Sequence, residues 1–218
     1  MNETAAIAQR FADGEIVLVG DDRDATVFVA AAADRVDRGG EPMRLVDARR
    51  DPELARLPVA PTAELVSAAM ARDAAATAVR CRLPTRDGAF HAVGLGPADN
   101  DRATVALVHG DLASVPAPLV HVHIACLFGD AFGSLLCDCR ARLQAATDAI
   151  IAAGAGMIVY AMPQGGSPTA CARDEPFDAA LAAGLLQASG VRVLRLAAGS
   201  PRVARELRRC GLQVADES

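Results

Sequence analysis

Residues 126–139 read CLFGDAFGSLLCDC and contain three of the six cysteines of the chain. Cys137 and Cys139 are two positions apart, so on an extended chain their side chains point to the same side. The glycines between Cys126 and this pair allow the chain to turn back and bring the three thiols together. Three thiolates on zinc leave a fourth position for water, as in catalytic zinc sites. The spacing therefore predicts a metal centre that holds Zn²⁺.

A closed site and a plain hydrophobic core are the two other interpretations of this cluster. A histidine upstream, His121 or His123, would close the site as a fourth ligand and make it structural. Free cysteines are also common in cores, where they behave as small apolar residues. The cysteines outside the cluster are interpreted as core or surface residues without a role in the site: Cys81, Cys171 and Cys210.

The composition restricts the possible partners, cofactors and compartments. A net charge of −5 over 218 residues argues against general binding to nucleic-acid phosphates. All 22 basic residues are arginines, which excludes a Schiff-base lysine and the lysine of a phosphate-binding loop. The sequence shows neither a signal peptide nor an apolar stretch that would span a membrane. We therefore expect a cytoplasmic protein, in which clustered thiols stay reduced and indicate metal binding or catalysis.

The first 75 residues are expected to form a small N-terminal lobe. The runs EIVLV (15–19) and TVFVAAA (26–32) are typical of strands, and a helix is expected over about 62–75. Asp21 and Asp22 lie in the turn between the two runs. Carboxylates in such a turn are usually solvated, although they could also bind Mg²⁺.

Residues 79–218 are expected to form a second domain, in which antiparallel strands precede βαβαβ layers. Four apolar runs between residues 79 and 128, separated by turn residues, predict an antiparallel meander. The later segments alternate between strand and helix patterns, which indicates a three-layer α/β (α+β) fold. The expected strands are 79–84, 90–95, 104–110, 119–128, 156–162, 191–196 and 212–215, and the expected helices are 140–154, 176–190 and 200–211.

The stretch HVHIACLFGDAFGSLLCDCRARLQAATDAI (121–150) resembles the core motif of GTP cyclohydrolase II, the zinc enzyme that opens riboflavin biosynthesis. The three cysteines keep the spacing of that motif, and so do Gly129, Asp130 and Ser134 between them. The upstream RLPTRDGAFHAVGL and the downstream GVRVLRLAAGSPRVARELRRCGLQV are also similar to family segments, so the resemblance covers about 79–215. Residues 1–75 faintly resemble the opening of dihydroxybutanone phosphate synthase, but they are too short for that activity.

The resemblance implies that Cys126, Cys137 and Cys139 bind zinc, and that water activated there opens the imidazole ring of a guanine. The positions that hold the triphosphate differ from the family pattern. The arginine that attacks the α-phosphate aligns with Phe177, and a phenyl ring cannot replace it. The threonine and lysine that hold GTP align with Ala197 and Val203.

Around this centre we assign further roles. His123 is a candidate proton shuttle, Asp130 and Tyr160 are candidate catalytic partners, and core packing is the alternative for Tyr160. Arg142 can contact an anionic substrate or lie on a solvated helix face. The candidate catalytic residues are thus His123, Asp130 and Tyr160, and the candidate substrate-binding residues are His121, Arg142, Gln164, Gly165 and Glu175.

Three functions follow as expectations. The first is a zinc hydrolase that acts on a purine- or pteridine-like heterocycle or nucleotide with fewer phosphates than GTP. The second is a non-catalytic relative in which zinc only stabilises the loop. The third is conventional GTP cyclohydrolase II activity. By resemblance we also expect a homodimer, with no nucleic-acid or membrane partner.

Overall fold

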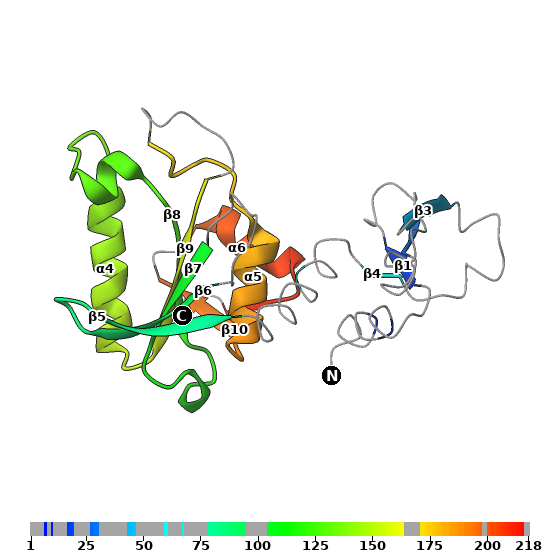
Figure 1. Cartoon of the computed structure of the whole chain (residues 1–218), viewed down its shortest axis with the longest axis horizontal. Coiled ribbons are helices and arrows are strands. Elements are labelled where there is room, and N and C mark those ends of the chain that lie inside the picture. The colour runs from blue at the N-terminus through cyan, green and yellow to red at the C-terminus, as the bar shows by residue number, and fades with distance from the viewer. Residues whose placement is uncertain are drawn as a thin grey trace. The chain divides into compact units, whose positions relative to one another are not determined.

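The computed structural model describes residues 7, 10, 17–19, 27–30, 43–46, 59–60, 67, 78–94, 104–163, 171–197 and 200–215. The chain divides into two compact units, residues 1–69 and residues 70–218 (Figure 1). The boundary between the units falls a few residues before residue 75, where the sequence analysis ended the N-terminal lobe.

The first unit contains a four-stranded sheet with the strand order β3-β2-β1-β4. Strand β1 pairs antiparallel with β2 and parallel with β4, and β2 pairs antiparallel with β3. Leu18 in β1 is buried. Asp21, Asp22 and all of the expected helix except Ser67 lie outside the described residues. The strands are β1 (Val17–Val19), β2 (Val27–Ala30), β3 (Met43–Val46) and β4 (Val59–Ala60).

The second unit is built on a seven-stranded sheet with the order β11-β10-β8-β9-β7-β6-β5. All seven strands lie in segments where the sequence predicted strands. The α/β class predicted from the sequence is thereby confirmed. The strands are β5 (Val79–Pro84), β6 (Ala89–Gly94), β7 (Thr104–His109), β8 (Leu119–Ile124), β9 (Gly156–Ala161), β10 (Val193–Leu196) and β11 (Gln213–Ala215).

The antiparallel meander is shorter than predicted. Strands β5, β6 and β7 pair antiparallel, but β8 runs parallel to both of its neighbours, β9 and β10. The prediction of β8 as a fourth antiparallel strand was therefore wrong. A helix connects β8 to β9, and a crossover of this length returns the chain in the same direction. Strand β8 also ends at Ile124, because the chain leaves the sheet there to form the cysteine loop.

Helices cover both faces of this sheet. Helix α4 (Cys139–Ala152) lies on one face, and α5 (Ala179–Ala188) and α6 (Pro201–Arg209) lie on the other (Figure 1). The carboxylate of Asp178 accepts a hydrogen bond from the Leu181 N–H at the start of α5. Ser200 caps α6 in the same way, with Pro201 in the first turn.

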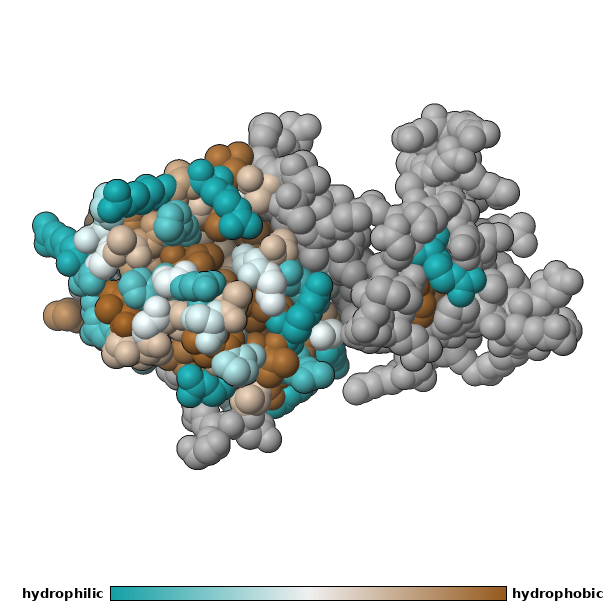
Figure 2. Space-filling model, turned by 90° about the horizontal axis from the view of Figure 1, so that it is seen from below, coloured by the Kyte–Doolittle hydropathy of each residue, from teal (hydrophilic) through white to brown (hydrophobic). Residues whose placement is uncertain are grey.

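The core consists mainly of aliphatic side chains, as the low aromatic content requires. Phe90, Ile150 and Ile158 form a buried cluster between the sheet and α4. Leu185 and Leu207, on α5 and α6, are fully buried. On the face shown in Figure 2, apolar and polar side chains of the described residues are interspersed. Strand β5, at the edge of the sheet, has all six residues exposed. No helix within the described residues has the length and apolarity that a membrane crossing requires.

Replacing Ile158 with alanine should test this core. The side chain is 1% exposed, so its loss leaves a cavity beside Phe90 and Ile150. We expect the free energy of unfolding to fall by about 3 kcal/mol in urea denaturation. The matched control is Leu135→Ala, because the Leu135 side chain is fully exposed at 100%, and its loss should change stability by less than about 0.5 kcal/mol. Equal effects of the two substitutions would contradict the assignment of the core.

Candidate metal centre

The cysteine loop connects the end of β8 to the start of α4. A π-helical turn, η3 (Leu127–Ala131), follows Cys126 and reverses the chain. The Asp130 N–H donates to the Cys126 carbonyl at 2.7 Å, and the Gly133 N–H donates to the Gly129 carbonyl at 3.1 Å. The loop then returns to Cys137, and Cys139 begins α4. The fold therefore brings together the three cysteines that the sequence pattern grouped.

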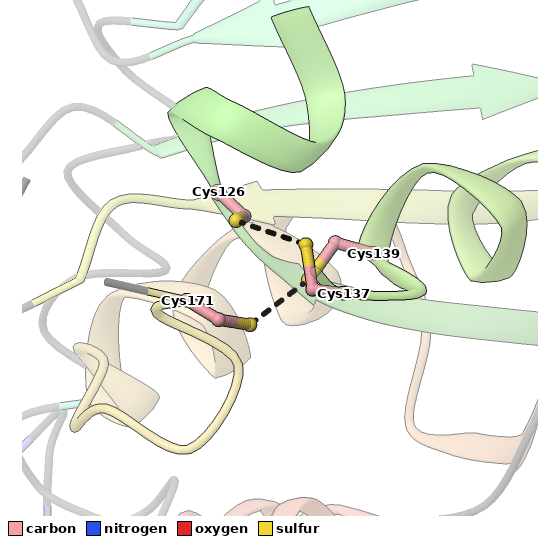
Figure 3. Close-up of side chains that lie close together, drawn as sticks. All are labelled: Cys126, Cys137, Cys139 and Cys171. Carbon is pink, nitrogen blue, oxygen red and sulfur yellow. Dashed lines mark hydrogen bonds between the residues drawn. The ribbon is translucent and has the colours of Figure 1, made fainter. Parts of the chain in front are cut away.

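Four thiols converge at this place, because Cys171 joins the three loop cysteines (Figure 3). The Sγ atoms of Cys126 and Cys137 are 3.8 Å apart, and those of Cys139 and Cys171 are 3.3 Å apart. All four sulfur atoms lie within 4.8 Å of one another. Tetrahedral zinc with Zn–S bonds of about 2.3 Å places its sulfur ligands about 3.8 Å apart. The spacing and chemistry of these donors therefore suit zinc.

Cys171 was interpreted from the sequence as a core or surface residue, and the position of its thiol beside the cysteine loop was not predicted. Cys171 is exposed, but its thiol lies next to that of the buried Cys139. No spacing rule connects two cysteines that are 32 residues apart. Only the fold, in which the segment after β9 returns to the start of α4, brings them together. The salt bridge from Arg173 to Asp138, at 2.8 Å, ties that segment to the cysteine loop.

Gly129 is the residue that lets the loop close around the sulfur atoms. A Cβ atom at this position would lie 2.8 Å from Cys137 Sγ, 2.9 Å from Cys139 Cβ and 3.3 Å from Cys126 Sγ. Any larger residue would therefore push the thiols apart. Its place in the motif is explained by this close contact and not by an unusual backbone conformation.

The carboxylate of Asp130 anchors the loop to the central strands. It accepts hydrogen bonds from the Cys126 N–H at 2.9 Å and from the Tyr160 hydroxyl at 2.8 Å. It also accepts a hydrogen bond from His123 Nε2 at 2.9 Å, and the His123 ring stacks on Tyr160. The three candidate catalytic residues thus form one connected network. Because their polar groups are bonded to one another, they hold the loop on β8 and β9.

Tyr160 is a donor in this network at neutral pH. Burial raises the pKa of its phenol, and the hydrogen bond to the Asp130 carboxylate raises it further. The phenol therefore stays protonated and acts as a hydrogen-bond donor.

His121 is a buried residue that lines a pocket beside the thiols. Burial, opposed in part by the hydrogen bond to Ala197, lowers the pKa of His121 to about 4, so the ring is neutral at pH 7. The Nδ1–H donates to the Ala197 carbonyl at 3.1 Å, which leaves Nε2 as an acceptor. This atom is buried and has no partner among the described residues, which is costly for a polar group.

The pocket is lined by charged side chains and by Cys139. Arg142 from α4 and Arg173 from the segment after Cys171 both line it. Gln164 and Gly165 lie outside the described residues, and Glu175 is not among the lining residues. The complete lining is His121, Val122, His123, Ile124, Cys139, Arg142, Arg173, Asp174, Ser200 and Val203.

The thiols differ in their acidity when no metal is bound. Burial and the hydrogen bond with Cys171 raise the pKa of Cys139. Burial also acts to raise the pKa of Cys126, but N–H groups of Gly129 and Ala172 outweigh it and lower the pKa overall. A metal ion therefore has to displace a proton from Cys139, and metal affinity should rise with pH.

Comparison with known proteins identifies the cysteine-containing domain. Residues 76–174, just under half of the chain, match the family model of GTP cyclohydrolase II. Over this segment the chain is similar to GTP cyclohydrolase II. The resemblance predicted from the cysteine motif is thereby confirmed.

The curated relatives include proteins named riboflavin biosynthesis protein RibBA. The one from Nocardia farcinica is 47% identical over 79 residues, which cover 36% of this chain and 19% of the relative. The one from Bacillus cereus is 41% identical over 87 residues, which cover 40% of this chain and 22% of the relative. The matched part thus spans only about a fifth of the length of these relatives.

Among solved structures, the chain is similar to RibBX, a two-domain 3,4-dihydroxy-2-butanone 4-phosphate synthase from A. baumannii. The TM-score is 0.47 at 12% sequence identity, and the match covers 99% of this chain and 100% of that chain.

Substituting Gly129 with alanine should weaken zinc binding. The added methyl group would force apart Cys137 and Cys139, so we expect zinc affinity to fall about tenfold or more. Competition with a chromogenic chelator measures this change. The matched control is Gly94→Ala, because a Cβ there meets nothing within 4 Å and zinc affinity should not change. Unchanged affinity in Gly129→Ala would show that the loop does not close as described.

His121 should make the metal-free protein sensitive to acid. Its folded pKa of about 4 lies below the ordinary value of 6.5, so its contribution is present above pH 6.5 and is lost as the pH falls toward 4. The expected loss is at most about 3 kcal/mol of unfolding free energy. In His121→Asn, which keeps a donor for Ala197 but does not titrate, this loss should disappear. Parallel stability profiles of the two proteins between pH 6.5 and pH 4 would contradict the assignment.

Proposed function

We propose that the second unit is a zinc-dependent hydrolase that cleaves a C–N bond in a purine- or pteridine-like ring. Zinc held by Cys126, Cys137 and Cys139 would lower the pKa of a bound water and polarise the ring. In the overall reaction, the oxygen of water bonds to a ring carbon, the C–N bond breaks and the nitrogen takes a proton. The observation that carries the proposal is the pocket beside the cluster, which Cys139 lines together with His121, His123 and Arg142.

The lining of the pocket supports a heterocycle with an anionic substituent. The ring of His121, which is neutral at pH 7, lines the pocket and can contact a heterocycle. Arg142 supplies positive charge for a single phosphate or an acidic ring oxygen, whereas Arg173, which also lines the pocket, is paired with Asp138 and Asp174. These residues bind and orient the ring, while the Asp130 network keeps the thiols in place.

Cleavage of a triphosphate is not part of the proposal. Phe177, which aligns with the phosphate-attacking arginine of the family, is 7% exposed and pairs with Pro163 through an isolated β-bridge. An apolar side chain packed in this way offers no nucleophile to a phosphate. We therefore expect substrates with one phosphate or none, and no release of pyrophosphate.

A non-catalytic, zinc-stabilised domain is the second candidate, and one observation favours it. The thiol of Cys171 lies where it could complete a tetrahedron of four sulfur atoms. A closed zinc site contributes to folding and does not activate water. In that case the pocket would bind a heterocycle without changing it.

Incubation of the zinc-loaded full chain with GTP, GMP, guanosine and pterins tests these candidates. We expect an ultraviolet spectral change with a compound that carries one phosphate or none, and none with GTP. In Cys137→Ser, turnover should fall at least 100-fold, because the metal is lost. The matched control is Cys81→Ser, whose exposed thiol lies outside the cluster. Formate and pyrophosphate formed from GTP would instead show conventional GTP cyclohydrolase II activity, and no turnover of any compound would favour the non-catalytic candidate.

Arg142→Gln tests the pocket separately from the metal. Removal of this charge should raise the KM or the dissociation constant of a monophosphate about tenfold, because one charge-assisted hydrogen bond is lost. The effect on the corresponding nucleoside should be small. An equal effect on both ligands would show that Arg142 does not contact the phosphate.

A further inference from the structure

We infer that Cys171 is a fourth thiolate ligand of the metal and closes the zinc centre with four sulfur atoms. The three-cysteine set implied by the family resemblance leaves the fourth position open. The inference depends on the zinc site of the proposed function but does not depend on turnover.

The positions of the sulfur atoms carry the inference. Cys171 Sγ lies 3.3 Å from Cys139 Sγ, and the group of four lies within 4.8 Å. In Figure 3 the thiols of Cys126, Cys137, Cys139 and Cys171 point toward a common centre. Because sulfur ligands of tetrahedral zinc are about 3.8 Å apart, small adjustments would place one ion at equal distance from all four.

The chain around Cys171 is attached to the metal loop. Arg173 donates from Nη1 to Asp138 Oδ1, and Asp138 lies between Cys137 and Cys139 in the sequence. The segment that follows Cys171 is therefore held against the loop that carries the other ligands.

A second set of contacts attaches the same segment to α6. The Arg202 guanidinium donates to the Asp174 carbonyl and, at 3.2 Å, to the Glu175 carbonyl. The Glu175 N–H in turn donates to the Ala172 carbonyl at 2.9 Å and closes a turn. Cys171 thus precedes a turn that is fixed to the rest of the domain.

The histidines near the cluster do not belong to the group of possible metal ligands. His123 Nε2 is bonded to Asp130, and His121 Nδ1 is bonded to the Ala197 carbonyl, although His121 Nε2 has no partner among the described residues. Within the described part of the chain, Cys171 is the side chain that joins the three loop cysteines as a possible metal ligand. The group that could hold an ion therefore consists of four thiols and no histidine.

Closure by Cys171 would also control access of water to the metal. Four thiolates fill a tetrahedral zinc site, so hydrolysis requires the Cys171 sulfur to leave. The Arg173–Asp138 pair that holds the segment is about half-exposed, with relative exposures of 45% and 54%, and surface pairs of this kind contribute little. Cys171 is itself exposed, so this ligand is the one that a substrate can displace most easily.

Zinc K-edge X-ray absorption on the zinc-loaded full chain tests the coordination directly. We expect four sulfur atoms in the unmodified protein, and three sulfur atoms with one oxygen or nitrogen in Cys171→Ala. Cys81→Ala is the matched control and should retain four sulfur atoms. Three sulfur atoms with one light atom in the unmodified protein would overturn the inference, as would four sulfur atoms in Cys171→Ala or the absence of bound zinc.

Chelator competition gives a second readout that does not depend on activity. Loss of a ligand in Cys171→Ala should lower zinc affinity about tenfold or more, with no change in Cys81→Ala. Thermal unfolding of the metal-free proteins should be the same, because the Cys171 side chain is exposed. Equal zinc affinity in all three proteins would contradict the assignment.

Turnover distinguishes failure of this inference from failure of the proposed function. If the spectrum shows four sulfur atoms and neither protein hydrolyses a heterocycle, Cys171 remains a ligand and the hydrolase proposal fails. If Cys171→Ala is at least tenfold faster than the unmodified protein, both proposals are supported. A spectrum with three sulfur atoms together with turnover would retain the hydrolase and reject the fourth ligand.

Discussion

The hydrogen bonds to the Asp130 carboxylate are the constraint on which the metal centre depends. One carboxylate joins the backbone of Cys126, the ring of His123 on β8 and the hydroxyl of Tyr160 on β9. Two parallel neighbouring strands thereby fix the start of the cysteine loop. An acceptor with several charge-assisted bonds is a strong anchor, so the start of the cysteine loop is held in place.

Most of the second unit could be predicted from the sequence, because its elements have strong local signals. The Ser200–Pro201 start of α6 and the alternating apolar runs of β5 to β7 depend on neighbouring residues alone. The predicted direction of β8 was wrong, because the pairing of a strand is decided by the whole sheet and its sequence pattern does not indicate its direction. Cys171 was missed for the same reason, since its partner Cys139 is distant in the sequence. The grouping of the three loop cysteines succeeded because they share one short loop.

The proposed function combines a metal centre with a pocket that differs from the family pattern. The His121 ring is neutral and lines this pocket. Phe177, which the resemblance aligns with the phosphate-attacking arginine of the family, is 7% exposed. Arg142 also lines the pocket, whereas the charge of Arg173 is shared with Asp138 and Asp174. In that proposal the metal ligands keep the family spacing, while the positions that would hold a triphosphate do not keep the family residues.

Strand β5 has a consequence for how the molecule behaves at high concentration. It pairs with β6 on one side only, and its other edge carries free backbone donors and acceptors among the described residues. Such an edge is a template for pairing with a second sheet and for aggregation. Arg80 and Arg82 place charges along it, and Pro84 at its end has no N–H to donate. Like charges that repel each other and a missing donor thus protect an otherwise open edge from intermolecular β-pairing.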